Sequence, residues 1–416
     1  IPSRLVGSEM CIRDRTSVGS VERINHVADI VRSEVDAKNQ VVVVLSAMAG
    51  ETDRLVNLTK DLSKDFSASE YDVIISSGEQ VSVGALSGLL NSLGVKSQSL
   101  LGWQVPIVTS SYHKSSRIEA ISSKVILKLL EENNVVIIPG FQGINSEGRV
   151  TTLGRGGSDT SAVAIAAAIK ADFCDIYTDV DGVYTTDPNK VPDAKRLDKI
   201  SYEEMLEMAS LGAKVLQTRS VETAMNNDVV LRVLSSFSDI GEKKKGTLVC
   251  SEDSISDKKI VTGVAASTND AKLTLTGIRD KPGVAAEILG TLAENNINVD
   301  MIVQNISNDR KTTDLTYTVP KDEFDNAKGL MDKLSETLSY ERLIVDSNIA
   351  KISIVGVGMR SNAGVASQMF DVLSKNNINI DVISTSEIKI SVLINKELTE
   401  KALNTLHEHF ELGNIN

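Results

Sequence analysis

Residues Thr151–Ser161 place three glycines, an arginine and a carboxylate directly before an apolar segment, Ala162–Ile169. The glycines allow the backbone to approach a ligand closely, and Ser158 or Asp159 can cap the helix predicted for the apolar segment. Free N–H groups at a helix start favour a carboxylate or a phosphate. Arg155 can bind a carboxylate through two parallel hydrogen bonds, and Asp159 offers the opposite charge to an ammonium group. The stretch predicts a pocket for an amino acid, with an ordinary αβ turn and a surface arginine as an equal alternative on this motif alone.

The segments around this motif alternate between short β-branched stretches and longer amphipathic ones as far as about residue 235. We expect strands at Val41–Ser46, Val105–Thr109, Val135–Pro139, Ile176–Thr178 and Val229–Val233. We expect helices at Val21–Asp36, Gly78–Leu93, Ser116–Glu132, Thr160–Ile169, Tyr202–Met208 and Ala213–Asn226. Strand followed by helix, repeated, predicts an α/β domain whose mostly parallel sheet is covered by helices on both faces. Ser46 ends the first of these strands, at the edge where ligands collect in parallel sheets.

Composition and charge narrow the class of protein. The chain has 416 residues, enough for two or three domains, and a net charge of −12 that argues against a nucleic-acid surface. No uninterrupted apolar segment reaches the length of a bilayer span, so we expect a soluble protein without a membrane partner. Three widely spaced cysteines fit reduced cytosolic thiols. The four histidines show no spacing for a zinc or iron site, and His407 and His409 are expected to be solvated helix residues.

The last third of the chain contains an internal repeat. A polar segment at 241–259 predicts a linker, and beyond it Gly283–Ala285 recurs as Gly364–Ala366, while Asn295–Asp300 recurs as Asn376–Asp381. Both recurrences lie 81 residues apart. Each copy has the pattern of a small βαββαβ module. Such modules have sheet edges that favour pairing within or between chains.

The joint occurrence of several motifs in one order makes the chain resemble the aspartokinases, ATP-dependent members of the amino acid kinase family with two C-terminal ACT modules. The motifs are Thr16–Ser20, Ser46–Met48, Ser77–Glu79, Gly140–Gly143, Thr151–Thr160, Tyr177–Tyr184 with Asp187-Pro188, and Ile383–Glu387. The resemblance implies an amino acid kinase-like sheet sandwiched by helices, followed by two ferredoxin-like ACT modules. Its implied boundaries are a catalytic domain at 16–240, a linker at 241–262, and ACT modules at 263–345 and 346–416.

The activity that the resemblance implies is phosphoryl transfer from Mg-ATP to the side-chain carboxylate of L-aspartate, the first step of lysine, threonine and methionine biosynthesis. It implies that Glu79 and Asp159 face the α-amino group and that Arg155 holds the α-carboxylate. Further pocket residues implied are Thr52, Gly156, Gly157 and Ser158. The nucleotide and its Mg²⁺ would be bound by Ser46, Thr178, Asp179, Tyr184, Asp187 and Lys214. Without the resemblance, Glu79 can also be a carboxylate at a helix start, and Lys214 can be a surface lysine.

The ACT modules imply feedback binding of lysine and threonine, assembly into a homodimer or higher oligomer, and a cytoplasmic location. The implied effector residues are Asp280, Gly283, Ala285, Asn298, Asp300 and Gln304 in the first copy and Asn379, Ile380, Thr385 and Ser386 in the second. Without the resemblance, these residues read as ordinary helix ends and strand starts. Two alternatives stay open: another amino acid kinase, such as one acting on glutamate or N-acetylglutamate, and a non-catalytic amino-acid sensor.

The N-terminal 15 residues depart from the family pattern. Aspartokinases have a strand leading into Lys-(Phe/Tyr)-Gly-Gly, whereas this chain has Ile12, Arg13, Asp14 and Arg15 at those positions. The preceding Ile1–Cys11 has no alternating strand pattern, so residues 1–15 are interpreted as a foreign segment. A cationic phosphate ligand is missing, so we expect weak or absent kinase activity from this chain and recovery when Lys-Phe-Gly-Gly with its strand is restored.

Overall fold

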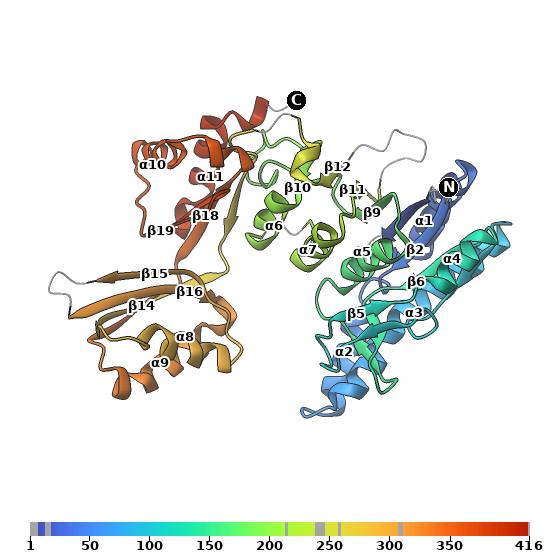
Figure 1. The fold of residues 1–416 in the computed structure, drawn as a ribbon, viewed down its shortest axis with the longest axis horizontal. Coiled ribbons are helices and arrows are strands. Elements are labelled where there is room, and N and C mark those ends of the chain that lie inside the picture. The colour runs from blue at the N-terminus through green and yellow to red at the C-terminus, as the bar shows by residue number, and fades with distance from the viewer. Residues whose placement is uncertain are drawn as a thin grey trace. The chain divides into compact units, whose positions relative to one another are not determined.

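The computed structural model describes residues 7–12, 18–212, 215–237, 246–256, 259–306 and 311–414. The chain forms two compact units (Figure 1). The first is drawn from residues 1–183, 196–209 and 214–256, and the second from residues 184–195, 210–213 and 257–416. The candidate motif at 151–161 lies in the first unit, and the repeat lies in the second.

An eight-stranded sheet organises the first unit, as the resemblance implied. Its strands, in spatial order, are β10 (Lys199–Ser201), β12 (Thr247–Cys250), β11 (Leu231–Ser235), β9 (Phe173–Thr178), β1 (Gly7–Ile12), β2 (Gln40–Leu45), β6 (Val135–Pro139) and β3 (Ser97–Ser99). All neighbours pair in parallel except β11 and β12, which are antiparallel. The predicted mostly parallel sheet is confirmed, and the carboxyl ends of β1, β2, β6 and β9 share one edge.

β1 differs from the prediction that Ile1–Cys11 has no strand. Its backbone pairs with β2 on one side and β9 on the other, with Ile12 opposite both Leu45 and Tyr177. Alternation of polar and apolar residues marks a strand with one solvated face, whereas a central strand of a parallel sheet is covered on both faces. The absence of alternation was therefore not evidence against a strand at this position.

Helices cover both faces of the sheet. α1 (Val21–Asp36) and α3 (Ala68–Ser92) share a core with the β2 side chains Val41, Val43 and Leu45. On the opposite face, α5 (Gly157–Ile169) contacts β1, β2 and β9, and α7 (Thr218–Asn227) packs against α5. Within the described residues, α3 alone is long and apolar enough to cross a bilayer by length and composition. Half of that window is buried, and α3 packs against β2 and β6, so it is a core helix.

Two predicted elements have a different form. The segment predicted as one helix at Ser116–Glu132 is a strand, β5 (Ile118–Ile121), followed by α4 (Lys124–Glu131). β5 belongs to a second sheet with β4 (Ile107–Thr109), β7 (Gln142–Ile144) and β8 (Val150–Thr152), in the order β5-β4-β7-β8. β4, predicted for the main sheet, is therefore part of this side sheet. Antiparallel pairing with β4 overrides the apolar spacing of the segment.

Two helices before the motif were predicted late or not at all. α3 begins ten residues before the predicted start at Gly78, and α2 (Glu51–Leu62) was not predicted. Gly78 lies inside α3, at the point where the helix passes close to the end of β2. A Cβ at this position would be 2.9 Å from Ala47 Cβ. The glycine thus permits close packing and does not mark a helix start.

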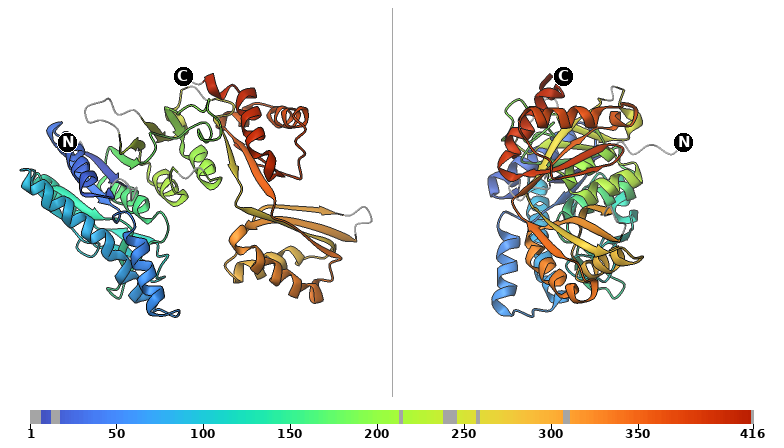
Figure 2. Two further views of the ribbon diagram at one scale, coloured as in Figure 1. Left: turned by 180° about the vertical axis from the view of Figure 1, so that it is seen from behind. Right: turned by 90° about the vertical axis from the view of Figure 1, so that its left-hand side faces the viewer.

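The first repeat module has the predicted βαββαβ order. Its elements are β14 (Asp270–Arg279), α8 (Val284–Glu294), β15 (Asp300–Ile306), β16 (Thr312–Pro320), α9 (Phe324–Leu338) and β17 (Arg342–Asp346). The strands form an antiparallel sheet in the order β15-β16-β14-β17. Both views of Figure 2 and Figure 1 show α8 and α9 on one face of this sheet. The other face carries no helix of the module.

The second module takes one strand from elsewhere in the chain. Its own elements are β18 (Ile349–Val355), α10 (Val365–Lys375), β19 (Val382–Thr385), β20 (Lys389–Asn395) and α11 (Thr399–His409). The fourth strand of its sheet is β13 (Gly263–Ser267), which precedes the first module and pairs antiparallel with β18. The predicted boundaries assigned β13 to the first module, so its assignment is corrected. Register with β18, and not sequence order, decides which sheet the strand joins.

His407 corrects another expectation, because it is 3% exposed and not solvated. Its Nε2 lies 2.9 Å from Thr185 Oγ1, a residue of the same compact unit. Burial lowers the pKa of His407 below its ordinary value, while the charge of Asp193 opposes this. A depressed folded-state pKa means that the neutral imidazole stabilises the fold above the unfolded pKa, and that this contribution is lost as the pH falls through the folded value.

We therefore expect the melting temperature of the second unit to fall as the pH drops below about 6.5. Scanning calorimetry between about pH 7.5 and pH 5.5 measures this. His407→Gln should reduce the pH dependence, because it removes the titrating ring. His409→Gln, which changes an exposed ring two residues away, is the control and should leave the dependence unchanged. Equal pH dependence in wild type and His407→Gln would contradict the assignment.

Candidate active site

Polar side chains gather at the carboxyl edge of the main sheet, where loops follow the buried strands. Ser46 and Ala47 follow β2, and Gly140 and Phe141 follow β6, whose last residue Pro139 is level with Leu45. A Cβ at Gly140 would lie 2.8 Å from Ser158 Cα, so the glycine lets α5 approach the end of β6. The fold thereby brings the first turn of α5 to the edge at which ligands bind in parallel sheets.

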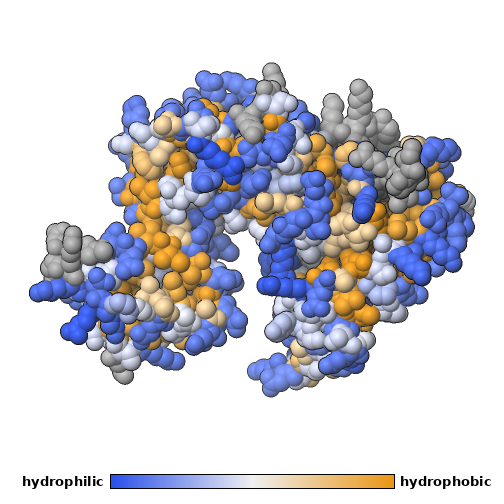
Figure 3. Space-filling model, viewed as in Figure 1, coloured by the Kyte–Doolittle hydropathy of each residue, from blue (hydrophilic) through white to orange (hydrophobic). Residues whose placement is uncertain are grey.

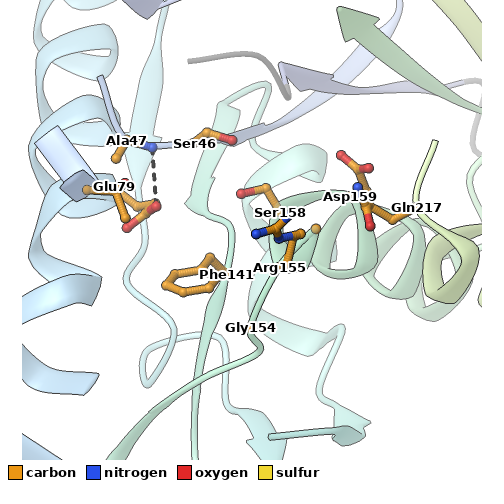
Figure 4. Close-up of a pocket in the computed structure, with 12 residues that line it drawn as sticks. Ser46, Ala47, Glu79, Phe141, Gly154, Arg155, Ser158, Asp159 and Gln217 are labelled. Carbon is orange, nitrogen blue, oxygen red and sulfur yellow. Dashed lines mark hydrogen bonds between the residues drawn. The ribbon is translucent and has the colours of Figure 1, made fainter. Parts of the chain in front are cut away.

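A pocket of about 240 Å³ opens at this edge (Figure 4). Its walls are Ser46, Ala47, Thr52, Glu79, Phe141, Gly154, Arg155, Gly156, Gly157, Ser158, Asp159 and Gln217. Pockets for drug-sized ligands run from about 300 Å³ upward. The volume therefore suits a small metabolite. All the substrate-pocket residues implied by the resemblance lie in this one wall.

The turn at 154–157 depends on its glycines. Gly154 and Gly156 have φ angles of +77° and +72°, which side-chain-bearing residues rarely adopt. A Cβ on Gly156 would lie 2.1 Å from Gln217 Cγ, and one on Gly157 would lie 2.7 Å from the ring of Phe141. Gly156 is the N-cap of α5, so the expectation that Ser158 or Asp159 caps the helix is wrong. Both residues lie instead in the first turn, because a left-handed glycine starts the helix three residues before the predicted position.

Charged side chains converge on the pocket from two helices and one turn. Glu79, on α3, is 4% exposed, and its Oε1 accepts a hydrogen bond from the Ala47 amide at 3.3 Å. Asp159, in the first turn of α5, is fully buried. Figure 4 shows Glu79 on one side of the pocket and Asp159 on the other, with Arg155 and Ser158 between them. A guanidinium between two buried carboxylates offers both signs of charge to one small zwitterion.

The residues predicted for the nucleotide are more scattered. Thr178 is buried at the end of β9, and its Oγ1 donates to Oδ1 of the exposed Asp179 at 3.1 Å. Both lie at the same sheet edge as Ser46. Tyr184 and Asp187 belong to the second compact unit, where Asp187 Oδ1 accepts the Asn189 amide in a tight turn. Lys214 lies outside the described residues.

Three pocket residues, Ala47, Phe141 and Gln217, were given no role in the sequence-based site prediction. Phe141 was part of a quoted motif but was given no role; the structure gives it a φ of +69°, an uncommon backbone conformation for an aromatic residue. Such strain is typical of functional sites. Gln217 lies just before α7 and packs against Gly156. No local pattern in the sequence signals its position, since only the α5–α7 packing brings it to the pocket.

The predicted effector residues of the first module separate into two groups. β14 and β15 both run antiparallel to β16, so they are parallel to each other. Asp280, Gly283 and Ala285 follow the end of β14, whereas Asn298 and Asp300 lie at the start of β15, at the opposite end of the sheet. Gln304 lies within β15. One module of one chain therefore does not bring these residues together.

Asp300 has a partner within the chain. The ammonium of Lys351, on β18 and 5% exposed, lies 2.7 Å from Asp300 Oδ2 and 3.5 Å from Asp270 Oδ2. Burial opposes ionisation of Asp300, but the hydrogen bond and charge of Lys351 lower the pKa of this carboxyl. An effector at Asp300 would have to share or displace Lys351.

In the second module, Asn379 and Ile380 precede β19, and Thr385 and Ser386 lie at its end.

No group of three or more histidine, cysteine or acidic side chains that could hold a metal occurs among the described residues. The pocket residues fit a zwitterionic amino acid through their charges, the size of the pocket and the position of the α5 N-terminus in its wall.

Comparisons with known proteins agree with the fold and the domain order that the resemblance implied. The amino acid kinase family model matches residues 15–235, and ACT domain models match residues 273–336 and 352–410. An aspartate kinase from Pseudomonas fluorescens (strain SBW25) is 53% identical over 400 residues, covering 95% of this chain and 96% of the relative. Two crystal structures of E. coli aspartokinase III are each 29% identical. The complex with aspartate and ADP (R-state) has a TM-score of 0.80 and covers 98% of this chain and 99% of its own; for the complex with lysine and aspartate (T-state) these values are 0.77, 97% and 99%.

Proposed function

The chain belongs to the amino acid kinase family, and we propose from this premise that it is an aspartate kinase. It transfers the γ-phosphoryl group of ATP to the side-chain carboxylate of L-aspartate, giving 4-phospho-L-aspartate and ADP. The observation that carries the proposal is the convergence of Arg155, Glu79 and Asp159 on one small pocket at the carboxyl edge of the sheet.

The pocket residues divide their work by charge. We propose that Arg155 binds the α-carboxylate of aspartate and that Glu79 and Asp159 face its ammonium group, with Thr52 and Gly156–Ser158 completing the wall. This leaves the side-chain carboxylate directed toward the nucleotide. An ionised carboxylate is already a nucleophile, so no general base is required. Its oxygen forms a bond to the γ-phosphorus as the bond to the β–γ bridging oxygen breaks, and the site supplies alignment and charge neutralisation.

The nucleotide is proposed to lie along the same edge. Ser46 would contact its phosphates, and Thr178 and Asp179 would lie beside it, since all three follow or end parallel strands there. For Tyr184, Asp187 and Lys214, a role in binding the nucleotide is proposed on the resemblance alone. Mg²⁺ would enter as part of Mg-ATP and keep several water ligands, as expected for a cation bound mainly through phosphates.

Feedback regulation is proposed for the ACT modules. Lysine is bound in the T-state structure of E. coli aspartokinase III, which supports lysine as an effector here. Threonine is proposed as a second effector from the resemblance. Because the effector residues of one module lie at opposite ends of its sheet, a complete site would combine residues of two modules. Regulation requires two arrangements that the effector binds unequally.

Assembly into a homodimer or higher oligomer is proposed through the ACT sheets. Figure 3 shows apolar side chains gathered over the sheets of the two modules. Edge strands carry large apolar residues that are partly exposed: Ile302 on β15 (49%), Ile344 on β17 (43%) and Ile383 on β19 (44%). Exposed apolar edge strands favour pairing with another chain. A cytoplasmic location is proposed with the same activity.

A coupled assay of ADP release tests the proposal. Weak turnover is expected with aspartate and ATP, and still less with glutamate. Turnover should also be lower with N-acetylglutamate, because its blocked amino group cannot meet Glu79 and Asp159 as an ammonium. Lysine or threonine, added separately and together, should lower the rate. Binding of lysine or threonine without turnover, after the N-terminal change described in the Discussion, would support the alternative of a non-catalytic sensor.

A further inference from the structure

A second buried carboxylate lies on the helix that carries Glu79. Asp72 is fully buried in α3, seven residues before Glu79, and therefore two helical turns away on the same side of the helix. It does not line the pocket. A buried carboxylate is costly unless it is fully hydrogen-bonded, so its partners show what it holds in place.

Asp72 binds three groups from two other segments. Its Oδ1 accepts a hydrogen bond from Thr152 Oγ1 at 2.6 Å, and its Oδ2 lies 2.6 Å from His113 Nδ1. Both oxygens lie 3.1 Å from the Lys114 amide nitrogen. An ionised carboxylate only accepts hydrogen bonds, so Nδ1 of His113 carries the proton in this contact. Charge-assisted bonds of this kind are short and directional.

These partners lead directly to the turn that carries Arg155. Thr152 is the last residue of β8, three residues before Arg155. The loop that contains His113 also holds β8, since the Ser116 amide donates to the Thr152 carbonyl at 2.9 Å. At the next glycine the fit is tight: a Cβ on Gly154 would lie 3.1 Å from the Lys114 carbonyl oxygen. Asp72 thus joins α3, the 113–116 loop and the start of the turn.

We propose that Asp72 is a positioning residue, which through Thr152 and His113 fixes the distance between Glu79 on α3 and Arg155 after β8. The inference deepens the proposed function and rests on it, because these two residues are assigned to the two ends of the α-amino acid group. A shift of either wall weakens the grip on aspartate, while the nucleotide, bound at other residues, is unaffected. Small displacements of positioned groups have large kinetic effects.

Thr152 allows the cleanest test. Thr152→Val removes the hydroxyl but keeps the shape, and Thr152→Ser keeps the hydroxyl. The matched control is Thr151→Val, which removes the neighbouring buried hydroxyl. That hydroxyl lies 2.5 Å from Thr109 Oγ1 and is not one of the hydrogen-bond partners described for Asp72. KM for aspartate, KM for Mg-ATP, kcat and melting temperature are measured for each variant and the wild type.

Thr152→Val is expected to raise KM for aspartate about tenfold, the effect of losing one charge-assisted hydrogen bond. KM for Mg-ATP should stay unchanged, Thr152→Ser should restore the aspartate KM, and Thr151→Val should leave it near the wild-type value. The inference is overturned if both valine variants change the aspartate KM equally, or if Thr152→Val raises both KM values together, since a general loss of structure would do either.

Calorimetric titration of wild type with aspartate separates this inference from the proposed function. If wild type neither turns over nor binds aspartate, the proposed function fails and takes the inference with it. If wild type binds aspartate, the dissociation constants of the same variants replace KM. An unchanged constant for Thr152→Val would then overturn the positioning role alone. Asp72→Asn, measured in the same way, should weaken aspartate binding at least as much as Thr152→Val.

Discussion

Replacing Arg155 by alanine is expected to reduce kcat/KM for aspartate by a factor on the order of 10²–10³, the usual consequence of removing one partner of a hydrogen-bonded charge pair. The guanidinium is the one cation in the described pocket wall, which also holds two buried carboxylates, Glu79 and Asp159. Without it, the α-carboxylate of the substrate would meet only negative charge and backbone amides. Steady-state kinetics with aspartate varied at saturating Mg-ATP measure the effect.

Two further variants show whether geometry or charge is responsible. Arg155→Lys keeps the charge but loses the two parallel hydrogen bonds, so it should recover only part of the activity. Arg149→Ala is the control: this arginine precedes β8 and forms a solvent-exposed ion pair with Glu70, a kind of contact that contributes little. If Arg155→Ala and Arg149→Ala had similar kinetics, Arg155 would have no part in substrate binding.

The second large effect is expected at the N-terminus. Replacing Ile12-Arg13-Asp14-Arg15 by Lys-Phe-Gly-Gly should raise kcat by roughly 10²–10³, comparable to the contribution of one group that stabilises transition-state charge. The strand needed to carry this motif is present, because β1 ends at Ile12, level with Leu45 and Tyr177 at the carboxyl edge. A lysine there would lie between β2, which ends at Leu45, and β9, which ends at Thr178. The measurement is kcat at saturating aspartate and Mg-ATP.

A double variant, Arg13→Ala with Arg15→Ala, removes the two charges without supplying the lysine and glycines. It should leave kcat low, which separates a specific phosphate ligand from a general change of charge. Equal turnover by the chain with Ile12-Arg13-Asp14-Arg15 and the chain with Lys-Phe-Gly-Gly would refute the idea that this position limits the rate.

Much of the fold could be predicted from the sequence wherever local pattern and tertiary environment agree. α1 has the predicted bounds, and β2 and β6 lie within one residue of them, because each combines a regular apolar pattern with clear turn residues. The repeat was visible because its Gly-Val-Ala turns recur as left-handed N-caps, Gly283 at φ +98° and Gly364 at φ +92°. Only glycine fits such a position readily.

The errors share one cause, which is that long-range packing decided the outcome. Gly78 was interpreted as a helix start because the close approach of Ala47, which accounts for a glycine inside α3, is not visible in the sequence. His407 was assigned to solvent because its partner Thr185 is 222 residues away. The pocket shows the same division: Arg155 and Asp159 were predictable from one motif, while Gln217 reaches the pocket only through contacts between α5 and α7.

The pairing of β13 with β18 makes the first module an insertion within a hairpin of the second. Ser267 lies opposite Lys351, so the chain leaves one strand and re-enters the adjacent one at neighbouring points. A polypeptide that ends at Asp346 would lack β18 and leave β13 without its neighbour. Splicing Ser267 to Asn348 through a tight turn, by contrast, would excise the inserted module and preserve all four strands of the remaining sheet.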